Sequence, residues 1–275
     1  MFEAAQEVPF DDASRVVFFS DCHRGDDSRA DAFSRNEDLF LHALTRYRRE
    51  GFTYIEVGDG DELWKNRRFG DVREAHGRTF DLFHELDREG RLHLVLGNHD
   101  LQNGQRGWVE KDGLVAREGL ILRHARTGQR LFVVHGHQAD FVSDQLRHVS
   151  RVMVRHVWRR VQLLGVGTGA RRDRVGQELV EWVQGQIGRI ERRIVDWVRD
   201  RRQAVICGHT HRPRCAPSGA APYFNAGSCV RPGAITGLEL RGGEIALVRW
   251  SARPRTARVE RELLAAPRKL ALFDW

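Results

Sequence analysis

The most constraining feature of this chain is the stretch 92–100, where an apolar run ends abruptly in Gly-Asn-His-Asp. The apolar part, 92–96, is short and flanked by glycines, a pattern that predicts a buried strand of a parallel sheet. Asn98, His99 and Asp100 follow where that strand would stop, which is where open α/β sheets place their sites. An amide oxygen, an imidazole and a carboxylate in succession suit a metal ligand beside an acid or base. A capped turn from strand to helix is the simpler alternative.

Four further apolar runs end in the same way, which weakens that simpler alternative. They are 16–19, 54–57, 131–134 and 204–207, and the polar residues that follow them include Asp21 and His23, Asp59, His135, and His209 and His211. The carboxyl ends of neighbouring parallel strands meet at one edge of a sheet. We therefore expect these side chains to converge.

The spacing of apolar residues between the runs predicts helices. Residues 36–50 and 72–88 carry apolar side chains on one helical face, so the first three runs should form a parallel βαβαβ unit. Two later stretches, 149–164 and 177–201, also repeat with helical spacing and are separated by glycines. We expect an antiparallel helical hairpin, an insertion at 140–202 that emerges beside the site and covers it as a lid.

The remainder of the chain predicts β-structure within the same domain. Residues 223–225, 235–240 and 245–249 are expected to be strands, the last two forming a hairpin around two glycines. The tail from 255 has no clear pattern. We treat 1–275 as a single domain, because a chain of 275 residues can bury one large core.

Composition and charge indicate the cellular compartment and the kind of partner. The first residues have no signal-peptide pattern, and the four cysteines have no Cys-x-x-Cys spacing, which suggests reduced thiols and a cytoplasmic protein. The net charge is +7, yet residues 147–202 alone hold 14 Arg against 6 Asp and Glu. This basic segment predicts an anionic partner, either a substrate or a lipid surface to which the protein attaches peripherally. Arg151, Arg155 and Arg159 recur every four residues and are the best candidates; a solvated helix face is the alternative.

The chemistry of the polar residues points to metal ions. Carboxylate, imidazole and amide donors without thiolate suit first-row divalent ions, manganese before iron or zinc, with magnesium also possible. Two ions about 3.5–4 Å apart, sharing a carboxylate, hydrolyse phosphate esters through attack of metal-bound hydroxide. One ion does not need all the candidate ligands, which are Asp21, His23, Asp59, Asn98, His135, His209 and His211.

The five polar blocks resemble, in order, the signature blocks of the calcineurin-like metallophosphoesterases. The resemblance spans residues 16 to about 230. It implies an α/β fold, a four-layer αββα sandwich of two mixed sheets, here with the helical hairpin inserted as a lid. It also implies the roles of the ligands: Asp21, His23 and His211 for one metal, Asn98, His135 and His209 for the other, and Asp59 as the bridge.

The resemblance further implies that His99 protonates the leaving oxygen, oriented by a nearby carboxylate. The family usually has Gly-Asp-x-x-Asp in its second block, whereas this chain has Glu62 in the last place, so Glu62 and Asp100 both remain candidates for that carboxylate. Arg24, after the first block, could bind a substrate phosphate. The run 58–64 is similar to that of the UDP-2,3-diacylglucosamine pyrophosphatases, although those enzymes typically have Arg where this chain has His99.

Four functions follow from these patterns. The leading one is a metal-dependent phosphoesterase acting on a phosphomonoester, phosphodiester or pyrophosphate. A UDP-2,3-diacylglucosamine-type pyrophosphatase at the membrane surface is the first alternative. A nuclease would use the basic segment, but that segment has no interleaved aromatic RNA- or DNA-binding motif, so nucleic acid ranks below a small-molecule substrate. A non-catalytic binding scaffold would be expected to have lost metal ligands, and all seven are present.

Overall fold

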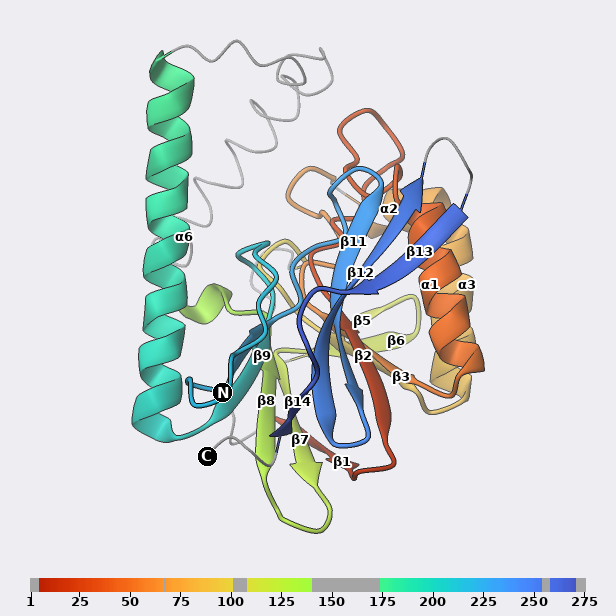
Figure 1. Cartoon of the computed structure of the whole chain (residues 1–275). Coiled ribbons are helices and arrows are strands. Elements are labelled where there is room, and N and C mark those ends of the chain that lie inside the picture. The colour runs from red at the N-terminus through yellow and green to blue at the C-terminus, as the bar shows by residue number, and fades with distance from the viewer. Residues whose placement is uncertain (1–4, 67, 101–107, 140–173, 254–257, 271–275) are drawn as a thin grey trace.

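Two β-sheets lie face to face between two layers of helix in the computed structural model, which describes residues 5–66, 68–100, 108–139, 174–253 and 258–270 (Figure 1). One apolar core fills the space between the sheets, and a second and a third lie between each sheet and its helices. The four layers confirm the predicted αββα sandwich.

The larger sheet contains the first three apolar runs as adjacent parallel strands, as predicted. Its order is β13 (Arg258–Leu263), β12 (Glu244–Arg253), β11 (Ala234–Arg241), β2 (Arg15–Phe19), β3 (Thr53–Val57), β4 (Leu92–Val95), β6 (Leu114–Arg117) and β5 (Trp108–Lys111), and β14 (Arg268–Lys269) pairs with β12. The predicted hairpin of β11 and β12 is confirmed. Gly242 and Gly243 both have positive φ at its turn, +62° and +69°, which side chains would strain.

The smaller sheet contains the other two runs. Its order is β1 (Gln6–Phe10), β7 (Gly119–His124), β8 (Arg130–Val134), β9 (Ala204–Cys207) and β10 (Tyr223–Asn225). The five runs therefore do not share one sheet edge. Their ends meet because the two sheets stack through apolar inner faces, with Phe18 and Ile55 on one side and Val133 and Ile206 on the other.

Helices α1 (Glu37–Arg49), α2 (Phe69–Ala75) and α3 (Gly77–Arg88) cover the larger sheet (Figure 1). The prediction of one continuous helix over 72–88 is wrong, because the helix breaks at His76. The imidazole of His76 is buried, with its ring nitrogens 2.8 Å from Asp31 and 3.2 Å from Glu37. The break between α2 and α3 thus lies at a buried cluster of charged side chains.

Helix α6 (Arg174–Arg201) covers the smaller sheet (Figure 1). Ile190, Ile194 and Val198 on one face of α6 pack against Phe132 and Val205. This helix corresponds to the second half of the predicted hairpin. The first half, 149–164, with Arg151, Arg155 and Arg159, lies outside the described residues. No helix in the described part of the chain has the length and apolar composition of a membrane span.

Candidate metal centre

The loops after β2, β3, β4, β8 and β9 bring the predicted ligands together at one end of the sandwich. Hydrogen bonds between these loops keep them close: the backbone N–H of His209 donates to Asp21 Oδ2 (2.9 Å), and that of His99 donates to Asp59 Oδ1 (2.8 Å). Each of these bonds joins segments far apart in the sequence. The local sequence sets where each strand ends, but the tertiary structure brings the loops after these strands together.

Five of the candidate ligands have left-handed backbone, a conformation that costs a side-chain-bearing residue about 1–3 kcal/mol. The φ angles lie between 50° and 65° at Asp21, His23, Asp59, His209 and His211. Such strain persists only where the surrounding structure enforces it, and it concentrates at functional sites. The ligand loops are accordingly shaped for side-chain placement rather than for the most stable local backbone.

Glycines permit the close approach of these loops. A Cβ at Gly97 would lie 2.1 Å from Asp59 Oδ1, and a Cβ at Gly208 would lie 1.7 Å from Ser20 Oγ. Any side chain at either position would have to displace its neighbour.

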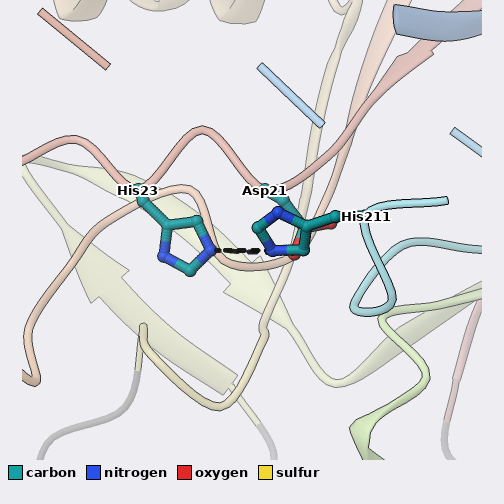
Figure 2. Close-up of side chains that lie close together, drawn as sticks. All are labelled: Asp21, His23 and His211. Atoms are coloured by element: carbon teal, nitrogen blue, oxygen red, sulfur yellow. Dashed lines mark hydrogen bonds and ion pairs between the residues drawn. The ribbon is translucent and has the colours of Figure 1, made fainter. Parts of the chain in front are cut away.

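Asp21, His23 and His211 form the first triad (Figure 2). His211 Nε2 lies 3.0 Å from Asp21 Oδ1 and 3.3 Å from His23 Nε2. His23 Nε2 is also 3.8 Å from Asp59 Oδ2. These separations allow one cation to contact all three side chains of the triad.

Asp59, His135 and His209 form the second triad, with donor atoms within 4.8 Å of one another. His135 Nε2 lies 3.1 Å from Asp59 Oδ2. Its other ring nitrogen, Nδ1, is 2.9 Å from the backbone oxygen of Val57, and a proton donated there leaves Nε2 available as a ligand. Because Asp59 also approaches His23, its carboxylate lies between the two triads.

Asn98 is the remaining candidate ligand. Its side-chain Oδ1 is buried and has no hydrogen-bond partner among the described residues. Buried amide oxygens are normally satisfied, so this atom fits a position where a cation would accept its lone pair. The oxygen and nitrogen donors of both triads with Asn98 fit divalent first-row ions.

The charges of the two triads are interdependent. Burial alone would raise the pKa of Asp59, but the imidazoles of His135 and His99 outweigh it and hold that pKa below its usual range. Burial lowers the pKa of His135, and the carboxylates of Asp59 and Asp21 outweigh it, raising that pKa to about 9. Without a cation, a proton on His135 balances these carboxylates; binding of a metal ion would release it.

Glu62 is the carboxylate that supports His99. Its Oε1 is 2.7 Å from His99 Nδ1, and its Oε2 is 3.3 Å from Nδ1 of His23. The indole of Trp64 stacks on the His99 ring, with centroids 4.1 Å apart and 22° between the planes. Burial raises the pKa of Glu62, but His99 and His23 outweigh it and keep that pKa well below its usual value. His99 is therefore held by an ionised carboxylate and an aromatic face.

Asp100 does not have the predicted role beside His99. Its carboxylate accepts hydrogen bonds from the backbone N–H groups of Gly97 (2.7 Å) and Asp61 (2.8 Å), and it lies 3.2 Å from Lys111 Nζ. Asp100 thus joins two ligand loops from beneath. The sequence analysis did not predict this role of Lys111. Lys111 is one of only three lysines in an arginine-rich chain, and that rarity could have singled it out.

The predicted contact of Arg24 with a substrate phosphate is also wrong. Arg24 is 1% exposed, and its guanidinium makes two hydrogen bonds to Glu56 (2.7 and 2.8 Å) and one to Asp61 (2.9 Å). All its charge is thus committed to buried carboxylates. Arg24 stabilises the loops beneath the ligands instead of facing a substrate.

The family model for calcineurin-like phosphoesterases matches residues 14–213, a range that includes all five ligand loops. No curated protein matches the chain.

Several solved structures are similar to the chain at low identity. Wild-type Vps29 complexed with zinc, from Entamoeba histolytica, is 14% identical, with a TM-score of 0.39 over 91% of this chain and 99% of that one. Vps29 from Cryptosporidium parvum is 11% identical, with a TM-score of 0.42 over 93% and 98%. A mutant cold-active protein tyrosine phosphatase is 14% identical, with a TM-score of 0.43 over 96% and 85%. By the match of its family model to most of the sequence, this chain belongs to the calcineurin-like phosphoesterase family.

Proposed function

We propose that this protein is a phosphoesterase that uses two divalent metal ions, manganese first among them, to hydrolyse a phosphomonoester, phosphodiester or pyrophosphate bond. The observation that carries the proposal is the pair of ligand triads with Asp59 between them. A single structural ion would need only one triad. The two triads together suit a pair of ions that share a carboxylate.

The chain's own residues have distinct parts in this reaction. The bound ions would supply Lewis acidity to the phosphoryl oxygens and to water. His99 would donate a proton from Nε2 to the leaving oxygen, because its Nδ1 is engaged by Glu62. The stacked Trp64 keeps the imidazole in one plane and excludes water from one side of it.

Metal removal and restoration test the proposal. Protein stripped by a chelator should not hydrolyse nitrophenyl phosphate or bis-nitrophenyl phosphate, and Mn²⁺ should restore turnover. Asp59→Asn should reduce activity more than Asp21→Asn, because the Asp59 carboxylate lies beside ring nitrogens of both triads, whereas Asp21 is a candidate ligand in the first triad alone. Full activity of the stripped protein would contradict the proposal, and a Mn²⁺-loaded protein inactive on every phosphate ester would favour a binding scaffold.

A pyrophosphate substrate linked to lipid, of the UDP-2,3-diacylglucosamine type, is the more specific proposal. It is supported by the run 58–64, whose Glu62 and Trp64 both contact His99, and by exposed arginines on the described part of α6. A surface of this kind would bind anionic lipid and attach the protein peripherally to the membrane from the cytoplasm. The test compares hydrolysis of a nucleoside-diphosphate lipid with that of single-stranded DNA and RNA, with binding to anionic and neutral vesicles. Cleavage of nucleic acid alone would favour the nuclease.

A further inference from the structure

The loop that carries His209 and His211 needs support from outside itself. Both residues have left-handed φ angles, 65° and 55°, and such backbone is stable only where neighbouring contacts enforce it. Thr210 lies between them and is 3% exposed. Contacts made by Thr210 therefore act on both ligands at once.

Two side chains from other elements hold Thr210. The Nδ2 of Asn225, at the end of β10, donates to Thr210 Oγ1 (3.1 Å) and to the backbone oxygen of Gly208 (2.7 Å). The Thr210 hydroxyl donates in turn to Oε1 of Glu191 on α6 (3.3 Å). The loop is thus fastened to the smaller sheet on one side and to α6 on the other.

Glu191 has further contacts with the same loop. Its Oε2 lies 3.7 Å from Arg212 and 4.0 Å from Arg214, and Arg212 also donates to Gln184, two turns earlier on α6. The Glu191 side chain is 14% exposed, so these charges are only partly screened by solvent. Because the apolar face of α6 packs independently on the smaller sheet, the carboxylate is presented from a fixed position.

We propose that Glu191 is a positioning residue for the metal centre, acting through Thr210. His211 belongs to the first triad and His209 to the second, so the contact between Glu191 and Thr210 constrains one ligand of each. Helix α6, from the insertion, is in this way part of the support of the metal site. The inference rests on the proposed metal-dependent function.

The test is a calorimetric titration of Mn²⁺ into the chelator-stripped full chain. Glu191→Ala should weaken Mn²⁺ binding roughly 10- to 100-fold, the usual effect of losing a residue that orients metal ligands. Glu191→Gln keeps an oxygen acceptor for Thr210 and should recover most of the affinity. Asp196→Ala is the matched control, because Asp196 is on the same helix with a side chain 68% exposed. It should bind Mn²⁺ as the wild type does.

A double-mutant cycle separates positioning from a general loss of structure. Thr210→Val keeps the shape but removes the hydroxyl that bonds to both Glu191 and Asn225, so it should weaken Mn²⁺ binding at least as much as Glu191→Ala does. The double variant should be no weaker than Thr210→Val alone. Unchanged affinity in Glu191→Ala, or additive losses in the cycle, would overturn the inference alone. A wild-type protein that binds no Mn²⁺ would overturn the proposed function with it.

Discussion

The buried imidazole of His76 should make the stability of this protein depend on pH across the neutral range. It is 1% exposed, and its two ring nitrogens face Asp31 Oδ2 at 2.8 Å and Glu37 Oε1 at 3.2 Å. Burial lowers the pKa of His76, but the two carboxylates outweigh it and raise that pKa to about 9. His76 is therefore an imidazolium in the folded protein at neutral pH.

The direction and size of the effect follow from this pKa. Unfolded histidine titrates near pH 6.5, so the ion pairs contribute fully below about pH 6.5 and are lost as the pH rises through about 9. At about 1.4 kcal/mol per pH unit, the whole loss is about 3 kcal/mol. Burial raises the pKa values of Asp31 and Glu37, but the interaction with His76 outweighs burial and lowers both pKa values. The stability from these ion pairs is therefore also lost in acid, as the pH falls through the lowered pKa values of the two carboxylates.

The measurement is the free energy of unfolding in urea for the wild type and for His76→Gln between pH 5.5 and 9.5. The neutral amide fills the site without titrating, and the difference between the two proteins cancels the titration of the other histidines. The stability advantage of the wild type should be largest near pH 6 and should shrink by about 3 kcal/mol by pH 9.5. A difference that stays constant over this range would refute the reasoning.

Three further predictions concern the site and its support. His99→Ala should slow substrates with poor leaving groups far more than nitrophenyl phosphate, with Mn²⁺ content unchanged; equal losses in kcat would argue against proton donation. Gly97→Ala should lower Mn²⁺ stoichiometry, because its Cβ would displace Asp59, whereas Gly70→Ala, with open space around it, should bind metal normally. Lys111→Met should destabilise the protein by about 3–5 kcal/mol in urea, because buried Asp100 loses its cation and buried Asp61 keeps only Arg24; a change below about 1 kcal/mol would contradict this.

Local sequence determined the order of the elements and which residues end them. An apolar run of four or five residues is driven into a core, and the polar residue after it cannot follow, so strand ends and candidate ligands could both be predicted from the same pattern. The βαβαβ unit and the hairpin of β11 and β12 were predicted on this basis. The strands β1, β5, β6, β7, β13 and β14 were missed, although β7 is longer than several of the strands that were predicted.

The tertiary structure decided which side chains face one another. The pattern after β3 contains two acidic residues, Asp61 and Glu62, and their order in the chain does not say which one reaches His99. Only the folded loop directs Glu62 to the imidazole and turns Asp61 to Arg24 and Lys111 beneath the site. For the same reason Arg24 was wrongly predicted to bind a substrate phosphate.

The physical reason lies in the range of the interactions. Burial of an apolar run depends on each residue and its near neighbours, so it can be predicted from the local sequence. A buried charge must find its partner wherever the fold brings one, because an unpaired charge in a core is costly. Arg24 meets Glu56 from 32 positions away, and Glu191 meets Thr210 from 19, so neither pairing could be known before the sheets and helix α6 were in place.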